Sequence, residues 1–453
     1  MKTPRNSRLW ACGCGLILLP SLACAQTQME VPAEGALFRE LFGSKLENEY
    51  SIKVHGVAQV GFATNTATTT DQARFGSSNN PVILSNSEGL QFNLLGLLIE
   101  KPIATNVIPR VTPLPGPVPQ DFSWGFAVET TYGPNALPAM GHGFEANWGV
   151  NRKPAANAPG SLRESYVAMP HVMAQFYLPY AYGMALTVGR FGSGVGFEIP
   201  GIWRPSPNFF YSRTYAMVAQ PDLVVGGLLS ANLMRSSAGL LAGELGLVNG
   251  RQNLQDNNGS KSLIGALRYR TSDMRTGVSY AIYTGNDENA PGHQVQMPTA
   301  RIIADSGQRR TQQSLTFTQA VGDQTNVAVE LVSGKQAGDG RPSTIDIISG
   351  PGFAGAKWSG LNAHANWRAS PTLAYGIRLE TFDDKDGFAL FPIAASKTRF
   401  NAVTIGTRYD FSKYVTLRPE LRHDWQSQGG VNAFGGGTER RQTTFSVDAV
   451  FNF

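Results

Sequence analysis

Residues 442–453, QTTFSVDAVFNF, alternate between apolar and polar side chains along nearly their whole length. In an extended chain one face carries Phe445, Val447, Ala449, Phe451 and Phe453, and the other carries Thr444, Ser446, Asp448 and Asn452, with Val450 as the one exception. This pattern is typical of the strand that closes an outer-membrane β-barrel, with its apolar face on lipid and its polar face on the lumen. An edge strand of a soluble β-sandwich is the less favoured interpretation. We expect Phe445, Phe451 and Phe453 to act as the signal by which the barrel-assembly machinery binds this strand.

The other end of the chain predicts export. A positively charged stretch, residues 2–8, precedes a mostly apolar run, residues 9–22, and a small-x-small cleavage site at residues 23–25. Residues 1–25 are therefore expected to be a signal peptide, since the apolar run is too short to span a bilayer. Lipidation at Cys24 is a less favoured alternative. All three cysteines precede the expected cut, so the mature chain is expected to have no disulfide.

Composition favours one large membrane barrel over several soluble domains. Charged residues make up only 16% of the chain and glycines number 50. Apolar runs after residue 26 fall well short of a membrane-spanning helix. Because only helices and closed barrels pair every backbone group inside hydrocarbon, a membrane protein without apolar helices is expected to be a barrel. The formal net charge of +5 comes largely from the signal peptide and is too weak to indicate nucleic acid as a partner.

Sixteen candidate strands follow residue 51 and predict the fold class. They are residues 52–62, 89–101, 122–132, 163–169, 182–191, 222–234, 240–250, 261–271, 275–284, 311–320, 325–334, 359–368, 372–382, 401–410, 414–424 and 442–453. Short links alternate with long ones, as in barrels with short periplasmic turns and long extracellular loops. We expect an all-β transmembrane antiparallel β-barrel of about 16 strands over residues 52–453, with 14 or 18 strands as alternatives.

Three segments do not fit simple strands or turns. Residues 26–51 are expected to be a periplasmic leader with a short amphipathic helix, although a loosely ordered leader is an equal alternative. The proline-rich link 102–121 is too long for a periplasmic turn, so it is either an unusual periplasmic arm or a sign of misplaced strand boundaries. The link 192–221, which includes Trp203 and Arg204, either folds inward to narrow a channel or caps the outside.

Charge placement decides which strand face looks inward. In residues 414–424, four charged side chains alternate with apolar ones, and an arginine facing lipid at mid-depth costs about 2–4 kcal/mol. The charged face should therefore line the lumen, and a barrel of this width leaves an aqueous channel. The expected pore-lining residues are Glu129, Arg190, Glu198, Arg268, Arg270, Arg378, Glu380, Arg408, Arg418, Glu420, Arg422 and Asp424. The alternative for any single one is that it pairs with its neighbours and braces the wall.

Motifs for catalysis or metal binding are weak. The six histidines show neither metal-ligand spacing nor an HExxH motif, and the glycine-rich residues 189–196 fit neither a phosphate loop nor a nucleophile elbow. We therefore expect no enzymatic activity, no metal and no cofactor.

Short motifs spread over most of the chain resemble one family. Residues 409–425, YDFSKYVTLRPELRHDW, together with 187–191, 196–198, 211–216 and 91–102, resemble the putative β-barrel porin-2, or OmpL-like, family. The resemblance implies an outer-membrane porin for passive diffusion of solutes. It places Arg190 and Glu198 near a constriction, and Arg418, Glu420 and Arg422 on the wall.

Three functions are consistent with these expectations. The first is a passive porin for small hydrophilic solutes in the outer membrane of a Gram-negative cell, embedded in outer-membrane lipid and possible as a homo-oligomer. The second is a substrate-specific channel with a binding site on an inward loop. The third is a closed barrel that acts as an adhesin or receptor. Arginines outnumber acids on the expected lumen faces, which favours anions.

Overall fold

The computed structural model describes residues 35–67, 89–110, 113, 115–141, 145, 148, 150, 165–199, 208–251, 254, 256, 259–287, 308–338, 354–390, 397–430 and 432–453. The expected signal peptide and the lipidation alternative at Cys24 lie outside these residues. So do Trp203 and Arg204 of the link 192–221.

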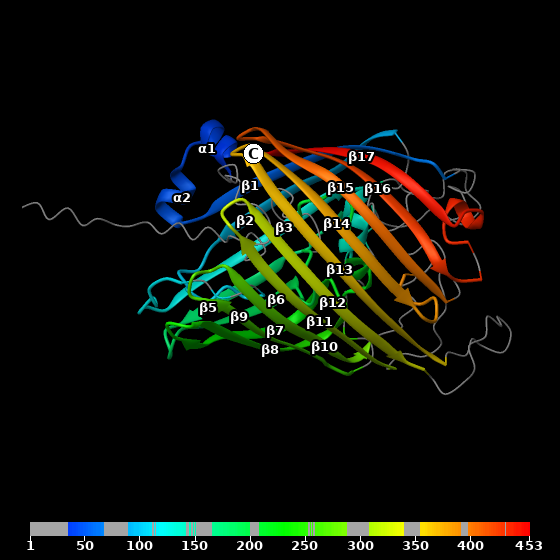
Figure 1. Cartoon of the computed structure of the whole chain (residues 1–453). Helices are drawn as coiled ribbons and strands as arrows, with labels where there is room; N and C mark the ends of the chain where they lie inside the picture. Colours follow the sequence, from blue (N-terminus) through cyan, green and yellow to red (C-terminus); the bar gives the residue numbers. More distant parts are fainter. Residues whose placement is uncertain are drawn as a thin grey trace, which may run out of the picture.

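The described residues form a β-structure with a few short helices (Figure 1). The strands are β1 (Lys53–Asn65), β2 (Gly89–Lys101), β3 (Ser123–Gly133), β4 (Tyr166–Ala168), β5 (Val172–Leu178), β6 (Met184–Gly192), β7 (Leu223–Arg235), β8 (Gly239–Arg251), β9 (Ser262–Thr271), β10 (Thr276–Asp287), β11 (Gln308–Val321), β12 (Thr325–Ala337), β13 (Gly355–Ser370), β14 (Leu373–Asp384), β15 (Thr398–Ser412), β16 (Val415–Gln428) and β17 (Arg441–Asn452). The helices are α1 (Ala36–Phe42), α2 (Lys45–Tyr50) and α4 (Tyr215–Ala219), with 3₁₀ turns η2 (Pro134–Ala139) and η6 (Gly435–Gly437).

The strands close into a single antiparallel barrel. Each strand pairs with its neighbours in sequence, and β1 pairs with both β2 and β17, which joins the two ends of the sheet. Both β4 and β5 pair with β3, so they are two halves of one interrupted strand. Counted this way, the barrel has the sixteen strands that the sequence predicts.

The interrupted strand corrects one sequence-based boundary. A strand was expected over 163–169, followed by a link to residue 182, but β5 continues the strand through Leu178. Pro170 lies at the break, because proline has no N–H for the ladder and strands tolerate it only at bulges or edges. The backbone N–H of Glu129 donates to the carbonyl of His171 at 2.8 Å and resumes the pairing just beyond the proline. A proline therefore interrupts this strand without ending it.

Alternation along each strand separates a lipid face from a lumen face. On β16, Leu421 is 45% exposed, whereas its neighbours Glu420 and Arg422 are 2% and 0% exposed. On β14, Leu379 is 48% exposed between the buried Arg378 and Glu380. The outward face is therefore apolar and the inward face polar, as in barrels that stand in a bilayer. The described helices are all too short or too polar to cross a membrane.

The C-terminal strand β17 closes the barrel against β1. Phe445 and Phe451 point outward and are half-exposed, while Val450, the exception in the alternation, is buried against Val57 and Leu94. The backbone of Phe453 pairs with Gly56, and a Cβ at Gly56 would lie 1.9 Å from the Phe453 ring. Glycine at this position therefore allows the terminal aromatic ring to cover the start of β1.

The N-terminal helices lie at the end of the barrel that carries the short turns. Glu40 of α1 accepts hydrogen bonds from Lys413 and Tyr414, in the turn between β15 and β16, at 2.8 and 2.7 Å. This ion pair is exposed, and its hydrogen bonds lower the pKa of Glu40 and raise that of Lys413. Helix α1 lies within the range where an amphipathic helix was expected.

Candidate functional site

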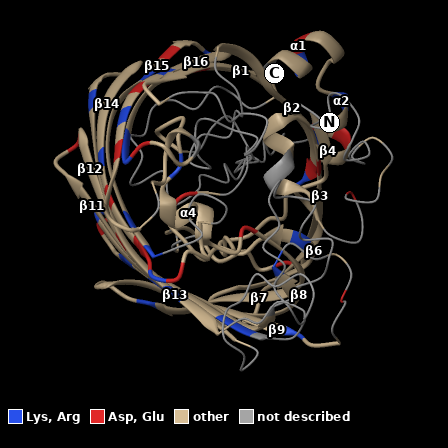
Figure 2. Cartoon of the chain, turned by 90° about the vertical axis from the view of Figure 1, so that its right-hand side faces the viewer, with Lys and Arg blue, Asp and Glu red and all other residues tan. Residues whose placement is uncertain are grey.

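The connection between β6 and β7 enters the barrel. We call residues 193–199 and 208–222, the described part of this connection, the inward segment. Figure 2 shows its helix α4 inside the ring of strands. The segment reaches β12, β14, β15 and β16 on the opposite wall, as the contacts below show. The link 192–221 therefore folds inward, which decides between the two alternatives left by the sequence.

The inward segment is held by six charged residues on the lumen face of β14 and β16. We call them the charged wall, and they are Arg378, Glu380, Arg418, Glu420, Arg422 and Asp424. All six are buried. Figure 2 shows bands of basic and acidic residues on these strands.

The first part of the charged wall binds the backbone around Phe210. Arg418 donates from Nη1 to the carbonyl oxygens of Asn208 and Phe210, at 2.8 and 2.9 Å. Glu420 accepts the backbone N–H groups of Tyr211 and Ser212, at 2.9 and 3.2 Å. One arginine and one carboxylate thus satisfy both donors and acceptors of an irregular backbone, which would otherwise be costly to bury.

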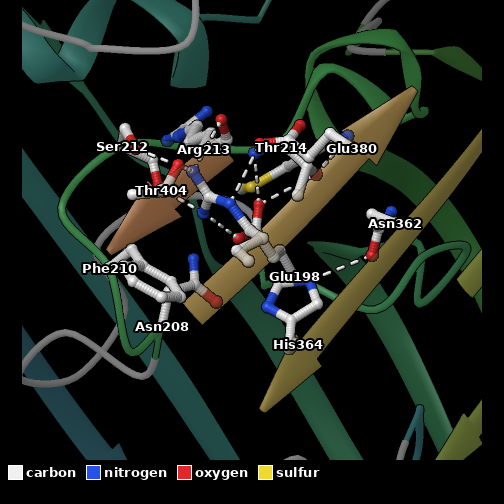
Figure 3. Close-up of polar contacts among 12 residues, drawn as sticks. Glu198, Asn208, Phe210, Ser212, Arg213, Thr214, Asn362, His364, Glu380 and Thr404 are labelled. Carbon is white, nitrogen blue, oxygen red and sulfur yellow. Dashed lines mark hydrogen bonds and ion pairs between the residues drawn. The ribbon is translucent and has the colours of Figure 1, made fainter. Parts of the chain in front are cut away.

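Figure 3 shows Glu198, Ser212 and Glu380 in one group of side chains, and Arg378 binds all three. Its Nη1 donates to Glu198 Oε1 and to the Ser212 carbonyl, both at 2.9 Å, and its Nε donates to Glu380 Oε1 at 3.0 Å. Glu198 belongs to the inward segment and also accepts from the backbone N–H of Thr214 at 2.7 Å. Burial raises the pKa of Glu198, while Arg378 and the Thr214 donor act in the opposite direction. The segment is therefore tied to the wall by an ion pair as well as by its backbone.

The last part of the charged wall binds helix α4. Glu380 accepts the backbone N–H of Tyr215 at 2.9 Å, and Asp424 accepts the Tyr215 hydroxyl at 2.7 Å. Arg422 joins the two carboxylates, at 2.6 Å from Glu380 and 2.9 Å from Asp424. Thr214 caps the helix by accepting from the backbone N–H of Met217. The acidic side chains therefore meet the N-terminus of α4, where unpaired N–H groups favour negative charge.

Glycines in the wall make room for the aromatic rings of the inward segment. A Cβ at Gly376 would lie 2.4 Å from the Phe209 ring, and one at Gly406 would lie 3.1 Å from the Phe210 ring. The two phenylalanines meet edge to face, with ring centroids 4.9 Å apart. The Arg378 guanidinium lies 4.7 Å above the Phe210 ring, which adds a cation–π contact. Wall and segment are thus matched in shape as well as in charge.

The structure gathers only part of the expected pore-lining set at this site. Glu198 and the six residues of the charged wall come together, and they contact protein in preference to open lumen. Arg408 on β15 lies 3.6 Å from Asp410. The residues of the charged wall thus pair with one another and with the inward segment.

The remaining expected residues lie on the other side of the barrel. The Glu129 carboxylate accepts a hydrogen bond from His171 Nδ1 at 2.6 Å, next to the break between β4 and β5. Arg190 pairs with Glu145, Arg268 pairs with Glu244, and Arg270 is fully buried. These residues are buried, and Arg268 also donates to the carbonyl of Gly194 in the inward segment at 2.9 Å.

Sequence analysis missed several residues of the site. Asp448 forms a two-point ion pair with Arg418, at 2.9 and 2.5 Å, and Glu330 accepts the backbone N–H of Phe197 at 2.9 Å. The alternation of residues 442–453 did place Asp448 on the polar face. Its partner could be found only from the register of β16 and β17, in which Arg418 lies opposite Asp448.

Groups of three or more metal-ligating side chains with suitable geometry are not found among the described residues.

The family model for putative beta-barrel porin-2, OmpL-like, matches residues 51–453. The chain belongs to this porin family. The match covers the whole barrel, and it agrees with a closed sheet that is apolar outside and polar inside. The protein is an outer-membrane porin. No curated protein matches this porin in sequence.

Solved structures of other outer-membrane channels resemble this porin in fold. The outer-membrane channel DcaP of Acinetobacter baumannii is 11% identical, with 89% of this chain and 97% of that chain covered and a TM-score of 0.51. The trimer form of OmpT from Vibrio cholerae (8% identity, 89% and 99% covered) and an anion-selective porin from Comamonas acidovorans (11% identity, 89% and 99% covered) each give a TM-score of 0.48. At 11% identity the likeness to DcaP supports the fold and says nothing about the solute.

Proposed function

We propose that this porin passes small hydrophilic solutes by passive diffusion, and that the docked inward segment sets their size limit. The observation that carries the proposal is the attachment of the inward segment to the charged wall across a lumen with a polar lining. Arg378, Arg418 and Glu420 hold the segment's backbone through bonds of 2.9 Å or close to it. A segment held in this way narrows the channel permanently.

Liposome swelling with sugars of increasing size tests this function, together with single-channel conductance of the purified porin. We expect stable open channels and a sharp fall in swelling rate above a limiting sugar size. Replacing residues 208–219 with a short Gly–Ser linker should raise both the conductance and the size limit. A wild-type protein that folds but conducts no ions would refute the function and would favour the closed adhesin or receptor instead.

A substrate-specific channel is the second candidate. The observation in its favour is the row of aromatic side chains, Phe209, Phe210 and Tyr211, that the inward segment brings into the barrel. A specific channel would show current that a given solute blocks saturably, whereas a general porin would show no such block.

Partners and domain organisation complete the proposal. Residues 1–25 would be removed as a signal peptide, residues 26–51 would form a periplasmic leader, and the barrel would contact outer-membrane lipid. Assembly would use the barrel-assembly machinery through β17, with Phe445, Phe451 and Phe453 as its signal. We expect a non-enzymatic protein that forms a homo-oligomer, which electrophoresis without heating would detect.

A further inference from the structure

The connection between β2 and β3 differs from the other links at the short-turn end. Those links run over residues 179–183, 236–238, 272–275, 322–324, 371–372 and 413–414, whereas this one runs over residues 102–122. Prolines stand at positions 102, 109, 113, 115, 117 and 119. The strand boundaries expected from sequence, 89–101 and 122–132, agree with β2 and β3. The link is therefore long in the structure itself, and its length does not come from misplaced strand boundaries. We call its described residues, 102–110, 113 and 115–122, the proline-rich segment.

The proline-rich segment folds into the barrel along the wall formed by β5 to β8. Asn106 is its anchor: its side chain donates to the carbonyl of Tyr182 at 2.7 Å and accepts from the Tyr177 hydroxyl at 3.2 Å. Asn232 donates to the Asn106 carbonyl at 3.1 Å. Asn232 is buried on β7, whereas its neighbour Leu233 is 51% exposed to the lipid side. The contacts are therefore with the lumen face of the wall.

Apolar packing supports the same placement. Ile103 and Val107 form a buried cluster with Tyr177 and Ala185, which belong to β5 and β6. Tyr177 also donates to the carbonyl of Pro119, so the two ends of the segment meet on one wall residue. Proline favours extended backbone and needs no partner for an N–H, so such a chain can lie on a barrel wall without joining the sheet.

Arg110 marks the innermost described part of the segment. Its backbone N–H donates to Glu244 on the lumen face of β8. Its φ of 68° is a left-handed conformation that an L-residue adopts only when its surroundings hold it. Its Nη1 donates to the carbonyl of Gly192 at 3.1 Å, and a Cβ at Gly194 would lie 2.8 Å from the Arg110 Cβ. The proline-rich segment thus meets the start of the inward segment at this residue.

The positive charge of the Arg110 guanidinium is not neutralised by an ion pair of its own among the residues that the structure describes. The Glu244 carboxylate forms its ion pair with Arg268, at 3.0 Å. Within the described residues, the hydrogen bond that Arg110 makes through its guanidinium goes to a neutral carbonyl. Burial lowers the pKa of Arg110 to about 10, so the side chain remains a cation at neutral pH. Arg110 and Arg268 are the two cations around the Glu244 carboxylate, so these three residues together carry a net positive charge.

We propose that the proline-rich segment forms a second narrowing of the lumen, built from the short-turn end, and that Arg110 at its innermost point gives this narrowing a preference for anions. The inference rests on the proposed function, because it assigns a selectivity-determining residue to the same channel. The inward segment narrows the lumen from the long-loop end and the opposite wall. The two elements meet at residues 192–194, so permeating solutes pass both.

Reversal potentials in a salt gradient test Arg110 directly. A unit positive charge roughly 7 Å away in water lowers the energy of a permeating anion by about RT and raises that of a cation by the same amount, so Arg110→Ala should lower the anion-to-cation permeability ratio by about sevenfold at low salt. Arg110→Glu should lower the ratio further, and Arg110→Lys should keep it near the wild-type value. Arg275→Ala, which removes an exposed arginine from the turn between β9 and β10, serves as the control and should leave the ratio unchanged.

A shortened variant tests the narrowing itself. Joining Ala104 to Ser123 through a two-residue Asn–Gly turn keeps the register in which Lys101 pairs with Phe126. This variant should raise the single-channel conductance and lower the anion-to-cation permeability ratio as Arg110→Ala does. Conductance and selectivity equal to wild type in the shortened variant and in Arg110→Glu would overturn the inference, while the proposed function would stand. A wild-type porin without conductance would instead refute the proposed function.

Discussion

Removing Arg378 should destabilise the protein more than removing any exposed arginine on the same wall. The Arg378 side chain is fully buried and donates to Glu198, Glu380 and Ser212. In Arg378→Met, Glu380 keeps Arg422 at 2.6 Å, but the buried Glu198 carboxylate loses its ion pair and keeps its hydrogen bonds from Thr214. Breaking a buried ion pair in this way costs about 3–5 kcal/mol.

The double variant Glu198→Gln/Arg378→Met separates this cost into its parts. Removing the carboxylate as well as the guanidinium leaves no unpaired buried charge. We therefore expect the double variant to be more stable than the sum of the two single losses by about 1–3 kcal/mol. Arg399→Met is the matched control, because Arg399 pairs with Asp383 at 2.9 Å but its side chain is 40% exposed. Its loss should cost no more than about 1 kcal/mol.

Guanidinium unfolding of the refolded porin in detergent micelles, followed by tryptophan fluorescence, measures these free energies. Conductance of the same samples shows whether the inward segment has left the wall, since a released segment should give larger and noisier currents. If Arg378→Met lowered the free energy of unfolding by no more than Arg399→Met does, the reasoning would be refuted. Strict additivity of the Glu198 and Arg378 substitutions would also refute it.

Three further predictions concern the lipid face, the pH dependence and assembly. Leu379→Arg should cost about 2–4 kcal/mol when the porin is unfolded from lipid vesicles, because it places a charge in hydrocarbon; a loss below 1 kcal/mol would contradict the assigned faces. Burial raises the pKa of Asp222 to about 6 despite the nearby Arg213, so the folded state holds a proton that the unfolded state releases near pH 4. The free energy of unfolding should therefore fall by about 2 kcal/mol as pH rises from 4 to 6, and Asp222→Asn should remove this dependence, which unfolding curves at several pH values would show. Deleting Phe453 should lower the yield of folded barrel in the outer membrane while refolding in detergent persists; equal yields in cells would count against the assembly signal.

Much of the fold was determined by the sequence alone, because a barrel wall has a two-residue repeat. Leu421 between Glu420 and Arg422, or Leu379 between Arg378 and Glu380, shows which face can meet lipid without knowledge of any partner. A charge in hydrocarbon costs enough to leave one orientation. The same local logic located the sixteen strands, and it failed only where Pro170 resembled the end of a strand.

What the lumen contains was decided only by the tertiary structure. Arg378 and Ser212 are separated by 166 positions in the sequence, and Arg418 and Asn208 by 210, so no local pattern could pair them. They meet because closure of β17 on β1 places β14 and β16 across from the connection between β6 and β7. The two-residue repeat shows that a charge faces inward but not whether it contacts water or protein, and only the fold determines that the charged wall contacts the inward segment.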